Sequence, residues 1–333
     1  MITRQLGNEG PIASALGLGC MGMSDLYGVP PERAESIATI RAALDAGITL
    51  LDTGDFYGMG DNEMLIAEAL QGYPRDKMMI SVKFGSLRDP AGQWLGVDGR
   101  PAAVKSALAY SLRRLRTDYI DVYRPARLDP NVPVEETVGA IAEMVKAGYV
   151  RYVGLSEVGT ATIRRAAAIH PIADLQIEYS LLSRGIEESI LPVCRALGIG
   201  ITAYGVLSRG LISGHWDKDR RASGGDFRAI SPRFQGENLS QNLSLVEAIR
   251  FVAQGKGATV AQIAIAWVLS RGNEIVALIG ARRRAQLEES FGAVDVRLTP
   301  EDIAALESAV PKNAACGDRY ARAQMAHLDS ERG

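Results

Sequence analysis

The amino-acid sequence predicts an α/β protein built on a (β/α)8 TIM barrel. Short apolar segments rich in β-branched residues alternate with segments of helical period, and this pair recurs eight times in about 290 residues. Several of the short segments are apolar almost throughout, which is typical of strands buried on both faces. Gly47, Gly148 and Gly198 stand where a helix would end before the next strand. Eight such units favour one barrel over a doubly wound sheet, which would usually divide a chain of 333 residues.

The predicted elements follow one another from the N-terminus. Residues 6–11 form a predicted turn of a β-hairpin that would plug the bottom of the barrel. The eight predicted strands span residues 15–19, 49–52, 78–84, 120–123, 150–155, 175–177, 200–203 and 275–279. The eight predicted helices lie near residues 31–46, 62–70, 102–115, 134–147, 160–169, 187–197, 259–269 and 285–291. We expect residues 1–333 to form one domain.

Two segments fall outside this repeat. Residues 205–243, after the seventh strand, show little periodicity and are too long for an ordinary connection. Loops of that length are usually functional lids or disordered, so one of these is expected here. The C-terminal residues 311–333 are polar, and they either cross the barrel mouth or fray.

Composition and charge exclude several classes of function. The chain has 37 basic and 39 acidic side chains, a net charge of −2 and a pI near 6.0, which favours neither nucleic acid nor an anionic membrane as a partner. Cys20, Cys194 and Cys316 lie far apart, which suits a reducing cytoplasm and excludes a disulfide scaffold or a thiolate zinc site. The N-terminus lacks a signal-peptide pattern, and the apolar runs are far shorter than the roughly 20 residues of a membrane helix. We therefore expect a cytoplasmic protein without a metal, and its oligomeric state stays open.

One glycine motif is misleading. Residues 17–22, Gly-Leu-Gly-Cys-Met-Gly, satisfy the G-x-G-x-x-G pattern of dinucleotide-binding folds. That pattern requires a helix that opens within the motif and an acidic residue about 20 positions later. Residues 23–31 read as a loop instead, and the next predicted helix begins only after it. We therefore set the Rossmann interpretation aside.

Three side chains suited to proton transfer stand at or just after the ends of the second and third strands, where barrel enzymes keep their active sites. Asp52 ends the second strand, Tyr57 lies on the following loop, and Lys83 ends the third strand. A lysine after an apolar strand needs a carboxylate partner, which Asp52 can supply. A lysine beside a tyrosine also lowers the pKa of the phenol from about 10 toward a range useful for proton transfer. Spacing alone leaves open a buried ion pair beside an ordinary loop tyrosine.

Further motifs give the sequence a family resemblance. They are Tyr57-Gly58 with four residues between Asp52 and Tyr57, the run Ser111-Leu-Arg-Arg-Leu-Arg-Thr-Asp-Tyr-Ile-Asp121, Gly154-Leu-Ser156, and Trp267 within Ala264-Ile-Ala-Trp-Val268. From the N-terminal hairpin to about residue 310, the sequence resembles the aldo-keto reductases. The resemblance implies a (β/α)8 barrel that reduces aldehydes and ketones with NADPH and without a metal. It makes Asp52, Tyr57 and Lys83 three of the family's four catalytic residues.

The resemblance also implies a set of contacts to NADP(H). Ser156, Glu157 and Gln176 would hold the nicotinamide carboxamide, although the family usually has asparagine at the position of Glu157, and Tyr204 would stack on the nicotinamide ring. The loop over the pyrophosphate would be formed by Gly205, Leu207, Ser208, Arg209 and Gly210. The adenosine phosphate would lie against Gly280, Ala281, Arg282, Arg283, Gln286, Glu289 and Ser290. Guanidinium groups suit bidentate phosphate binding, so Arg282 and Arg283 favour NADP over NAD, unless they only form a solvated helix start.

One residue of the family pattern is missing. The fourth catalytic residue is a histidine at the end of the fourth strand, and Ala126 stands at that position. The sequence has three histidines, and none of them is placed to substitute. Either Tyr57 acts alone, or Arg124 or Arg127, which flank the gap, supplies a cationic donor. Trp94 is a candidate wall of the substrate pocket or a plain packing residue, and Tyr27 could also face the pocket.

These observations predict an NADPH-dependent oxidoreductase that reduces an aldehyde or ketone to an alcohol. Hydride would pass to the carbonyl carbon of a small substrate, and Tyr57 would donate the proton. The alternative is an NADP(H)-binding regulatory or sensor protein with weak or no turnover. Ala126 and Glu157 favour the alternative, whereas the intact Asp52, Tyr57 and Lys83 oppose it.

Overall fold

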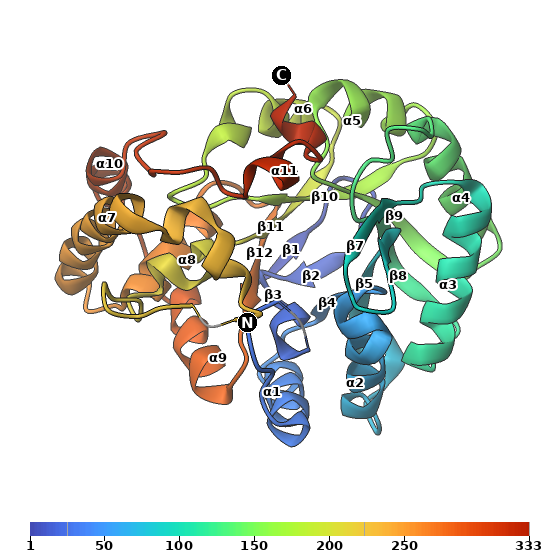
Figure 1. Cartoon of the computed structure of the whole chain (residues 1–333), viewed down its shortest axis with the longest axis horizontal. Helices are drawn as coiled ribbons and strands as arrows, with labels where there is room; N and C mark the ends of the chain where they lie inside the picture. Colours follow the sequence, from blue (N-terminus) through green and yellow to red (C-terminus); the bar gives the residue numbers. More distant parts are fainter. Residues whose placement is uncertain (25, 223, 333) are drawn as a thin grey trace.

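The computed structural model describes residues 1–24, 26–222 and 224–332 of the chain. Within these residues, eight parallel strands close into a barrel in the order β3-β4-β5-β8-β9-β10-β11-β12, and β12 pairs with β3 (Figure 1). The strands are β3 (Leu16–Gly19), β4 (Leu50–Gly54), β5 (Met79–Phe84), β8 (Ile120–Pro125), β9 (Val150–Ser156), β10 (Ile172–Glu178), β11 (Gly200–Tyr204) and β12 (Ile275–Gly280). Each predicted strand overlaps one of them, so the predicted (β/α)8 barrel is confirmed.

Helices surround the strands on the outside of the barrel (Figure 1). Those that match predicted helices are α1 (Arg33–Asp45), α2 (Asp61–Ala69), α3 (Pro101–Leu115), α4 (Val134–Lys146), α5 (Thr160–Ala167), α6 (Ile190–Ala196), α8 (Val260–Ser270) and α9 (Arg284–Phe291). The others are α7 (Gly236–Gly255), α10 (Pro300–Ala309) and α11 (Arg322–Met325). Helix α7 corrects the expectation that residues 205–243 form one loop, because it begins at Gly236. Its buried Leu239, Val246 and Ile249 follow a helical spacing. This spacing escapes prediction because the residues before it, from 205 onward, are largely polar and aperiodic.

Two β-hairpins lie outside the barrel sheet. Strands β1 (Thr3–Gln5) and β2 (Ile12–Ser14) pair antiparallel, and the Leu6 N–H donates to the Pro11 carbonyl at 3.0 Å, which confirms the predicted plug. Gly7 has a φ of +68°, and a Cβ there would lie 2.5 Å from the Gly198 carbonyl oxygen, so only glycine fits. The second hairpin, β6 (Ser86–Arg88) with β7 (Trp94–Val97), lies in the loop after β5 and is not among the predicted elements.

The barrel interior changes character from its bottom toward the C-terminal ends of the strands. At the bottom, the hairpin residues Leu6 and Ala13 pack in an apolar cluster with Leu50, Met79 and Val276. Higher in the barrel, the buried side chains include Asp52, Lys83, Arg124 and Asp174. Buried charges require ion partners and hydrogen bonds, so this polar layer identifies the functional end of the barrel.

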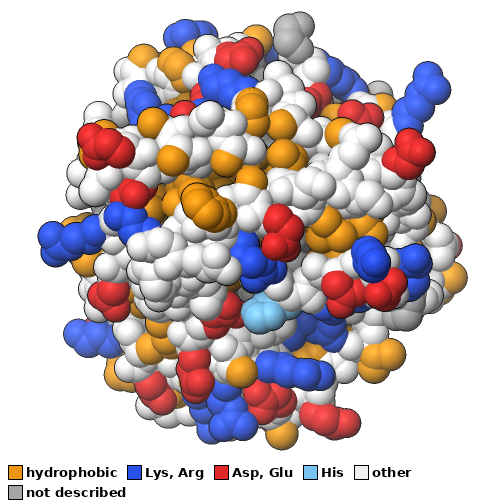
Figure 2. Space-filling view, turned by 90° about the vertical axis from the view of Figure 1, so that its left-hand side faces the viewer, with side chains coloured by type: hydrophobic (Ala, Val, Ile, Leu, Met, Phe, Trp, Pro, Cys, Tyr) orange, Lys and Arg blue, Asp and Glu red, His pale blue; other side chains and the backbone are white. Residues whose placement is uncertain are grey.

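The outer surface shows no segregation of charge on the side that carries α7 and α10. Acidic and basic side chains are interspersed there with scattered apolar ones (Figure 2). Among the helices of the described residues, none has the length and apolar character needed to cross a membrane.

The C-terminal segment, defined as residues 311–332, crosses the mouth of the barrel. In Figure 1 it runs from α10 across the strands to α11, in red. Its far end reaches β9, where the Gly159 N–H donates to Asp329 Oδ2 at 2.8 Å and the Ser330 N–H donates to the Glu157 carbonyl at 3.2 Å. Of the two expected arrangements, the segment therefore adopts the crossing.

Candidate active site

A buried ion pair stands at the centre of the polar layer. Lys83 Nζ pairs with Asp52 Oδ1, and both side chains are almost fully buried. Asp52 Oδ2 accepts hydrogen bonds from Ser81 Oγ at 2.8 Å and from Gln176 Nε2 at 2.7 Å. Strands β4 and β5 are neighbours in the barrel, and their register places Gly54 opposite Lys83, so the predicted pairing of Asp52 with Lys83 follows from strand order. Every oxygen of Asp52 is thereby satisfied, as a buried carboxylate requires.

Tyr57 lies directly above this pair. The residue is 6% exposed, and Lys83 Nζ lies 5.1 Å from the centroid of its ring. Burial raises the pKa of Tyr57 well above its usual value, and the Asp52 carboxylate raises it further. The expected lowering of the Tyr57 pKa is therefore wrong, because burial dominates and the Asp52 carboxylate, which pairs with the Lys83 ammonium, adds to the increase. Arg127 is the cation that acts to lower the pKa of Tyr57.

Arg124 and Arg127 follow one another on β8 and just beyond it, yet they occupy different places. Arg124 is fully buried inside the barrel, with Nη1 3.1 Å from Asp174 Oδ2 and Nη2 donating to Ser81 Oγ at 3.0 Å. It is an internal ion pair beneath the mouth. Arg127 is half-buried at the mouth, and its Nη1 donates to the Ala126 carbonyl at 2.7 Å. Of these two arginines, only Arg127 is placed to face a bound molecule.

Ala126 is buried at the end of β8, and its N–H donates to the Phe84 carbonyl at 2.8 Å. Each histidine is engaged elsewhere. His170 Nδ1 lies 2.8 Å from the Pro171 carbonyl, His215 Nε2 lies 2.9 Å from Glu289 Oε2, and the ring of His327 packs on Trp94 with centroids 4.4 Å apart. The residue that follows Ala126 at the barrel mouth is Arg127.

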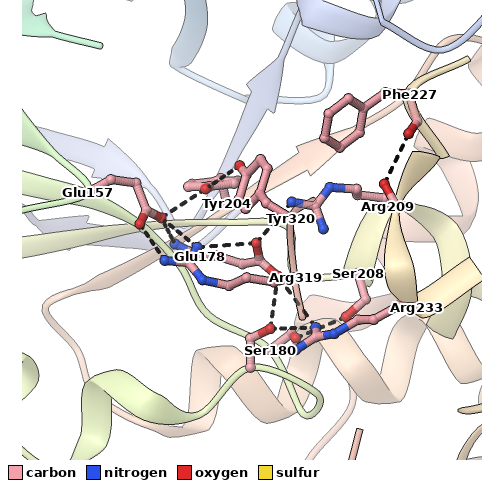
Figure 3. Close-up of polar contacts among 12 residues, drawn as sticks. Glu157, Glu178, Ser180, Tyr204, Ser208, Arg209, Phe227, Arg233, Arg319 and Tyr320 are labelled. Atoms are coloured by element: carbon pink, nitrogen blue, oxygen red, sulfur yellow. Dashed lines mark hydrogen bonds and ion pairs between the residues drawn. The ribbon is translucent and has the colours of Figure 1, made fainter. Parts of the chain in front are cut away.

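The Glu157 carboxylate, next to buried Ser156 at the end of β9, is saturated with donors (Figure 3). Its Oε1 accepts from the Glu178 N–H at 3.0 Å, from Tyr204 Oη at 2.8 Å and from Arg319 Nη1 at 2.9 Å. Its Oε2 accepts from Arg319 Nη2 at 2.5 Å and from Ser330 Oγ at 2.6 Å. With this structure in place, Glu157 has no capacity left for a carboxamide, and it anchors the C-terminal segment instead.

The C-terminal segment thus contributes two residues that the sequence does not reveal. Arg319 pairs with Glu157, and Tyr320 places its hydroxyl 2.7 Å from that of Tyr204 (Figure 3). Arg319 and Glu157 are 162 positions apart, and no periodicity links them. The only signal in the sequence for these two contacts is that Arg319 and Tyr320 are adjacent in a polar C-terminal segment.

A second carboxylate, Glu178 at the end of β10, gathers three arginines (Figure 3). Arg209 Nη2 lies 3.2 Å from Glu178 Oε2, Arg319 Nη1 lies 3.3 Å from the same oxygen, and Arg233 Nη1 lies 3.6 Å from Oε1. Burial alone would raise the pKa of Glu178, but these arginines lower it. Arg209, expected on the pyrophosphate, therefore points inward and stacks over the Tyr320 ring at 4.3 Å.

The rest of the loop after β11 makes tight backbone turns. Gly205 and Gly210 have φ of +65° and +92°, and Leu207 stands just before the 3-10 helix η5 (Ser208–Ser213). Ser208 Oγ lies 3.0 Å from Ser180 Oγ. Left-handed backbone here brings N–H groups close to one another, as in loops that cradle anions.

The residues expected at the adenosine phosphate lie on β12, on α9 and in the turn between them. Arg282 donates through Nη1 to the Tyr27 carbonyl at 2.9 Å, and its N–H donates to Gln286 Oε1 at 2.9 Å. Arg283 is exposed at the start of α9. The structure also places Gly280 in open space, Ala281 in the core, Glu289 beside His215, and Ser290 Oγ against the Gln286 carbonyl at 2.9 Å.

Positive charge accumulates around Arg282. Burial lowers the pKa of Arg282, and the nearby cations Arg228 and Arg283 lower it further. The carboxylate of Asp226 pairs with Arg228 at 2.6 Å and only partly offsets this charge. Guanidinium groups of this kind are suited to bind phosphate oxygens.

Trp94 and Tyr27 are the remaining pocket candidates. Trp94 is 43% exposed on β7 and contacts His327 of the C-terminal segment, so it lies at the rim. Tyr27 pairs with Asp226 in an isolated antiparallel bridge, which joins the loop after β3 to the loop after β11. The Arg228 guanidinium lies 5.0 Å from the Tyr27 ring centroid. Tyr27 therefore helps to hold these two loops together.

Comparison with known proteins agrees with this geometry. The sequence matches the model of the "Aldo/keto reductase family" over residues 15–311. It is 42% identical over 316 residues to a protein of Glycine max described as "Probable aldo-keto reductase 1", covering 95% of this chain and 91% of the relative. The fold superposes on a glycerol dehydrogenase of Gluconobacter oxydans with a TM-score of 0.85, 27% identity, and coverage of 98% of this chain and 96% of the other. An aldo-keto reductase of Bacillus halodurans in its holo form gives a TM-score of 0.77, 26% identity, and coverage of 93% and 96%.

Proposed function

Because the chain belongs to the aldo/keto reductase family, and is thus an oxidoreductase of carbonyl compounds, we propose that it reduces an aldehyde or ketone to an alcohol with NADPH. Tyr57 would donate the proton. The observation that supports this most directly is the assembly of Tyr57 over the buried Lys83–Asp52 pair. When bound, the nicotinamide cofactor supplies the hydride.

The side chains around the groove fit such a cofactor. The guanidinium groups of Arg228, Arg282 and Arg283 suit its phosphates, and exposed Arg283 suits the 2′-phosphate that distinguishes NADP from NAD. Tyr204 ends β11, Ser156 ends β9, and Gln176 lies on β10 between these strands, so Tyr204 offers an aromatic ring for the nicotinamide on the same side of the barrel. Gln176 already donates its amide to Asp52, so its Oε1 oxygen is the atom left for a carboxamide.

The protonation state of Tyr57 matches the role of a donor. Since burial holds its pKa above the usual range, the phenol carries its proton at neutral pH. Asp52 pairs with the Lys83 ammonium, whose Nζ lies 5.1 Å from the Tyr57 ring centroid, and the Tyr57 side chain is almost fully buried. A proton held in this way moves to a carbonyl oxygen only when negative charge develops there.

The test is NADPH oxidation, followed by absorbance, with a panel of pyridoxal, aromatic aldehydes and small ketones. Tyr57→Phe should lower kcat by about 10²–10⁴-fold on any accepted substrate, because it removes the proton but keeps the ring. NADPH binding, measured by fluorescence, should persist in the variant. If the wild-type protein binds NADPH tightly but turns over nothing in the panel, the sensor alternative replaces the reductase.

We further propose that the protein works in the cytoplasm on a small-molecule carbonyl substrate, without nucleic-acid or membrane partners. The free thiols of Cys20 and Cys194 are buried, and that of Cys316 is half-buried. Such unpaired cysteines suit a reducing compartment.

A further inference from the structure

Arg127 differs from five other cations near the barrel mouth. These five have carboxylate partners: Lys83 with Asp52, Arg124 with Asp174, Arg209 and Arg233 with Glu178, and Arg319 with Glu157. Among the residues that the structure describes, Arg127 has none. Its two hydrogen bonds go to neutral oxygens, the Ala126 carbonyl at 2.7 Å and Tyr320 Oη at 3.5 Å.

Arg127 nevertheless keeps its charge in a half-buried position. Burial by itself would lower its pKa, but Tyr320, Tyr204 and Glu157 outweigh this effect and raise it. Withdrawing a cation from water is costly unless an anion compensates it. No carboxylate of the described residues contacts the Arg127 guanidinium directly. An anionic group of a ligand could therefore neutralise its charge.

A directed chain of hydrogen bonds holds Arg127 in place. Glu157 is ionised, because Arg319 and Ser330 outweigh the effect of burial and lower its pKa to about 2, so Tyr204 must donate its proton to Glu157. The Tyr320 hydroxyl must then donate to Tyr204 (Figure 3). The oxygen of Tyr320 is thereby left to accept from Arg127 Nη2. A guanidinium has five N–H donors, so the contacts to Ala126 and Tyr320 leave others open.

Arg127 lies near the end of β5, the strand that carries Lys83. It follows Ala126, whose N–H is bonded to the end of β5 just beyond Lys83. Its charge acts on both Tyr57 and Lys83, lowering the pKa of each. Because β4, β5 and β8 are neighbours in the barrel, a group bound to Arg127 would lie on the side of the mouth that carries Tyr57.

We propose that Arg127 binds an oxyanion carried by the substrate, so that the preferred substrate is a carbonyl compound bearing a carboxylate or a phosphate ester. This inference rests on the proposed reductase function, because it specifies the substrate class of the same site. Tyr320 is a positioning residue, which orients Arg127 through its hydroxyl.

The experiment compares two aldehydes that differ only in charge, 4-carboxybenzaldehyde and its methyl ester, methyl 4-formylbenzoate. The wild-type enzyme should favour the acid by about 10–100-fold in kcat/KM, the range of a charge-assisted hydrogen bond. The preference should fall as salt is added, because the mouth is open to solvent. Pyridoxal phosphate and pyridoxal form a second pair, which tells a phosphate ester from a carboxylate as the favoured anion.

The variants separate binding of the anion from other effects. Arg127→Met should bring the acid-to-ester ratio near one by raising KM for the acid, and Arg127→Lys should restore part of it. Tyr320→Phe should lower the ratio by a smaller factor, again through KM. The control is Arg297→Met, which removes one exposed arginine and should leave the ratio as it is.

Two results would overturn the inference, and they are distinguishable. If the wild type reduces acid and ester equally and Arg127→Met lowers kcat for both, Arg127 acts on the carbonyl oxygen and the reductase proposal stands. Calorimetry with the product 4-(hydroxymethyl)benzoate covers the case without turnover. Arg127-dependent binding there would support the anion site while the reductase proposal fails, and its absence would reject both.

Discussion

At the scale of single residues, the Glu157 carboxylate is the anchor of the C-terminal segment. Arg319 meets it with two nitrogens, and Ser330 donates to it from the same segment. Removing one partner of such a buried pair leaves the other charge uncompensated, at a cost of about 3–5 kcal/mol when nothing relaxes. Here the segment can lift and admit water to Glu157, so the cost of losing Arg319 is expected to fall below that range.

The Glu157–Arg319 pair predicts an acid-sensitive stability. Glu157 has an ordinary pKa of 4.5 that falls to about 2 in the folded protein, where the effect of Arg319 outweighs that of burial. A carboxyl whose pKa is depressed by folding stabilises the protein above pH 4.5, and this contribution, of about 3 kcal/mol, is lost as the pH falls toward 2. Arg319→Gln should therefore be less stable at pH 6, yet lose less stability between pH 4.5 and 3.

The measurement is the free energy of unfolding by urea at pH 6, 4.5 and 3. Arg322→Gln is the matched control, because Arg322 is exposed at the start of α11 in the same segment. Its pH profile should parallel that of the wild type. A parallel profile for Arg319→Gln as well would show that Glu157 keeps its low pKa without Arg319.

The residues that the sequence predicts are those whose partners follow from strand order. Asp52 and Lys83 lie on neighbouring strands near their C-terminal ends, so a barrel brings them together whatever the loops do. Arg127 was one of two candidates, and only the direction in which each side chain leaves β8 separates it from Arg124. Arg319 could not be predicted, because its contacts depend on the path of a segment without periodicity.

At the scale of elements, the C-terminal segment behaves as a strap held at several points. Arg319 and Ser330 bind Glu157, Asp329 caps the Gly159 N–H, and His327 packs on Trp94 of the hairpin β6–β7. Most of these contacts come from side chains rather than from a core. Segments held in this way open locally at a lower free energy than the barrel strands.

Hydrogen exchange tests this hierarchy. Amides of residues 319–332 should be protected in the wild type, but less than those of β4 and β5. In Arg319→Gln, the exchange of this segment should speed up by tenfold or more, while the strands stay as they were. Equal protection of the segment in both proteins would mean that Ser330, Asp329 and His327 hold it without Arg319.

The elements that escape prediction share a physical reason. The eight strand–helix pairs of the barrel repeat a pattern in which apolar spacing decides the element, and these eight pairs are predicted, whereas α7 is not. The hairpin β6–β7 is short and exposed, with Leu87, Trp94 and Leu95 turned outward, so it carries no burial pattern. Helix α10 begins with a capping box of Thr299 and Asp302 around Pro300, which is a helix start signal. The helix was not predicted because the apolar periodicity that follows this signal is weak, with Leu306 as its buried residue.

At the scale of the whole molecule, charge is unevenly distributed. The chain has a net charge of −2, yet three arginines around the barrel mouth, Arg127, Arg282 and Arg283, have no ion-pair partner among the described residues. Cations without carboxylate partners attract ligands of the opposite charge, which suits both a dinucleotide and an anionic substrate.

This distribution predicts that NADPH stabilises the fold more than NADH does. A ligand present at 100 times its dissociation constant adds about 2.7 kcal/mol to the free energy of unfolding, so the thermal midpoint reports relative affinity. Arg283 is exposed and open to a 2′-phosphate, whereas Arg282 is bonded to the loop after β3. Arg283→Ala should therefore weaken NADPH by about 10–100-fold, the range of a charge-assisted hydrogen bond, and weaken NADH far less.

The neighbouring arginine provides the control for this last prediction. Arg284 carries the same charge at the start of the same helix, but its guanidinium is paired with Glu35 at 3.0 Å. Arg284→Ala should thus leave the difference between NADPH and NADH intact, since that guanidinium is already neutralised by the protein. If Arg283→Ala and Arg284→Ala reduce NADPH stabilisation equally, general charge sets the preference. If Arg283→Ala weakens NADPH and NADH to the same extent, Arg283 lies outside the phosphate site.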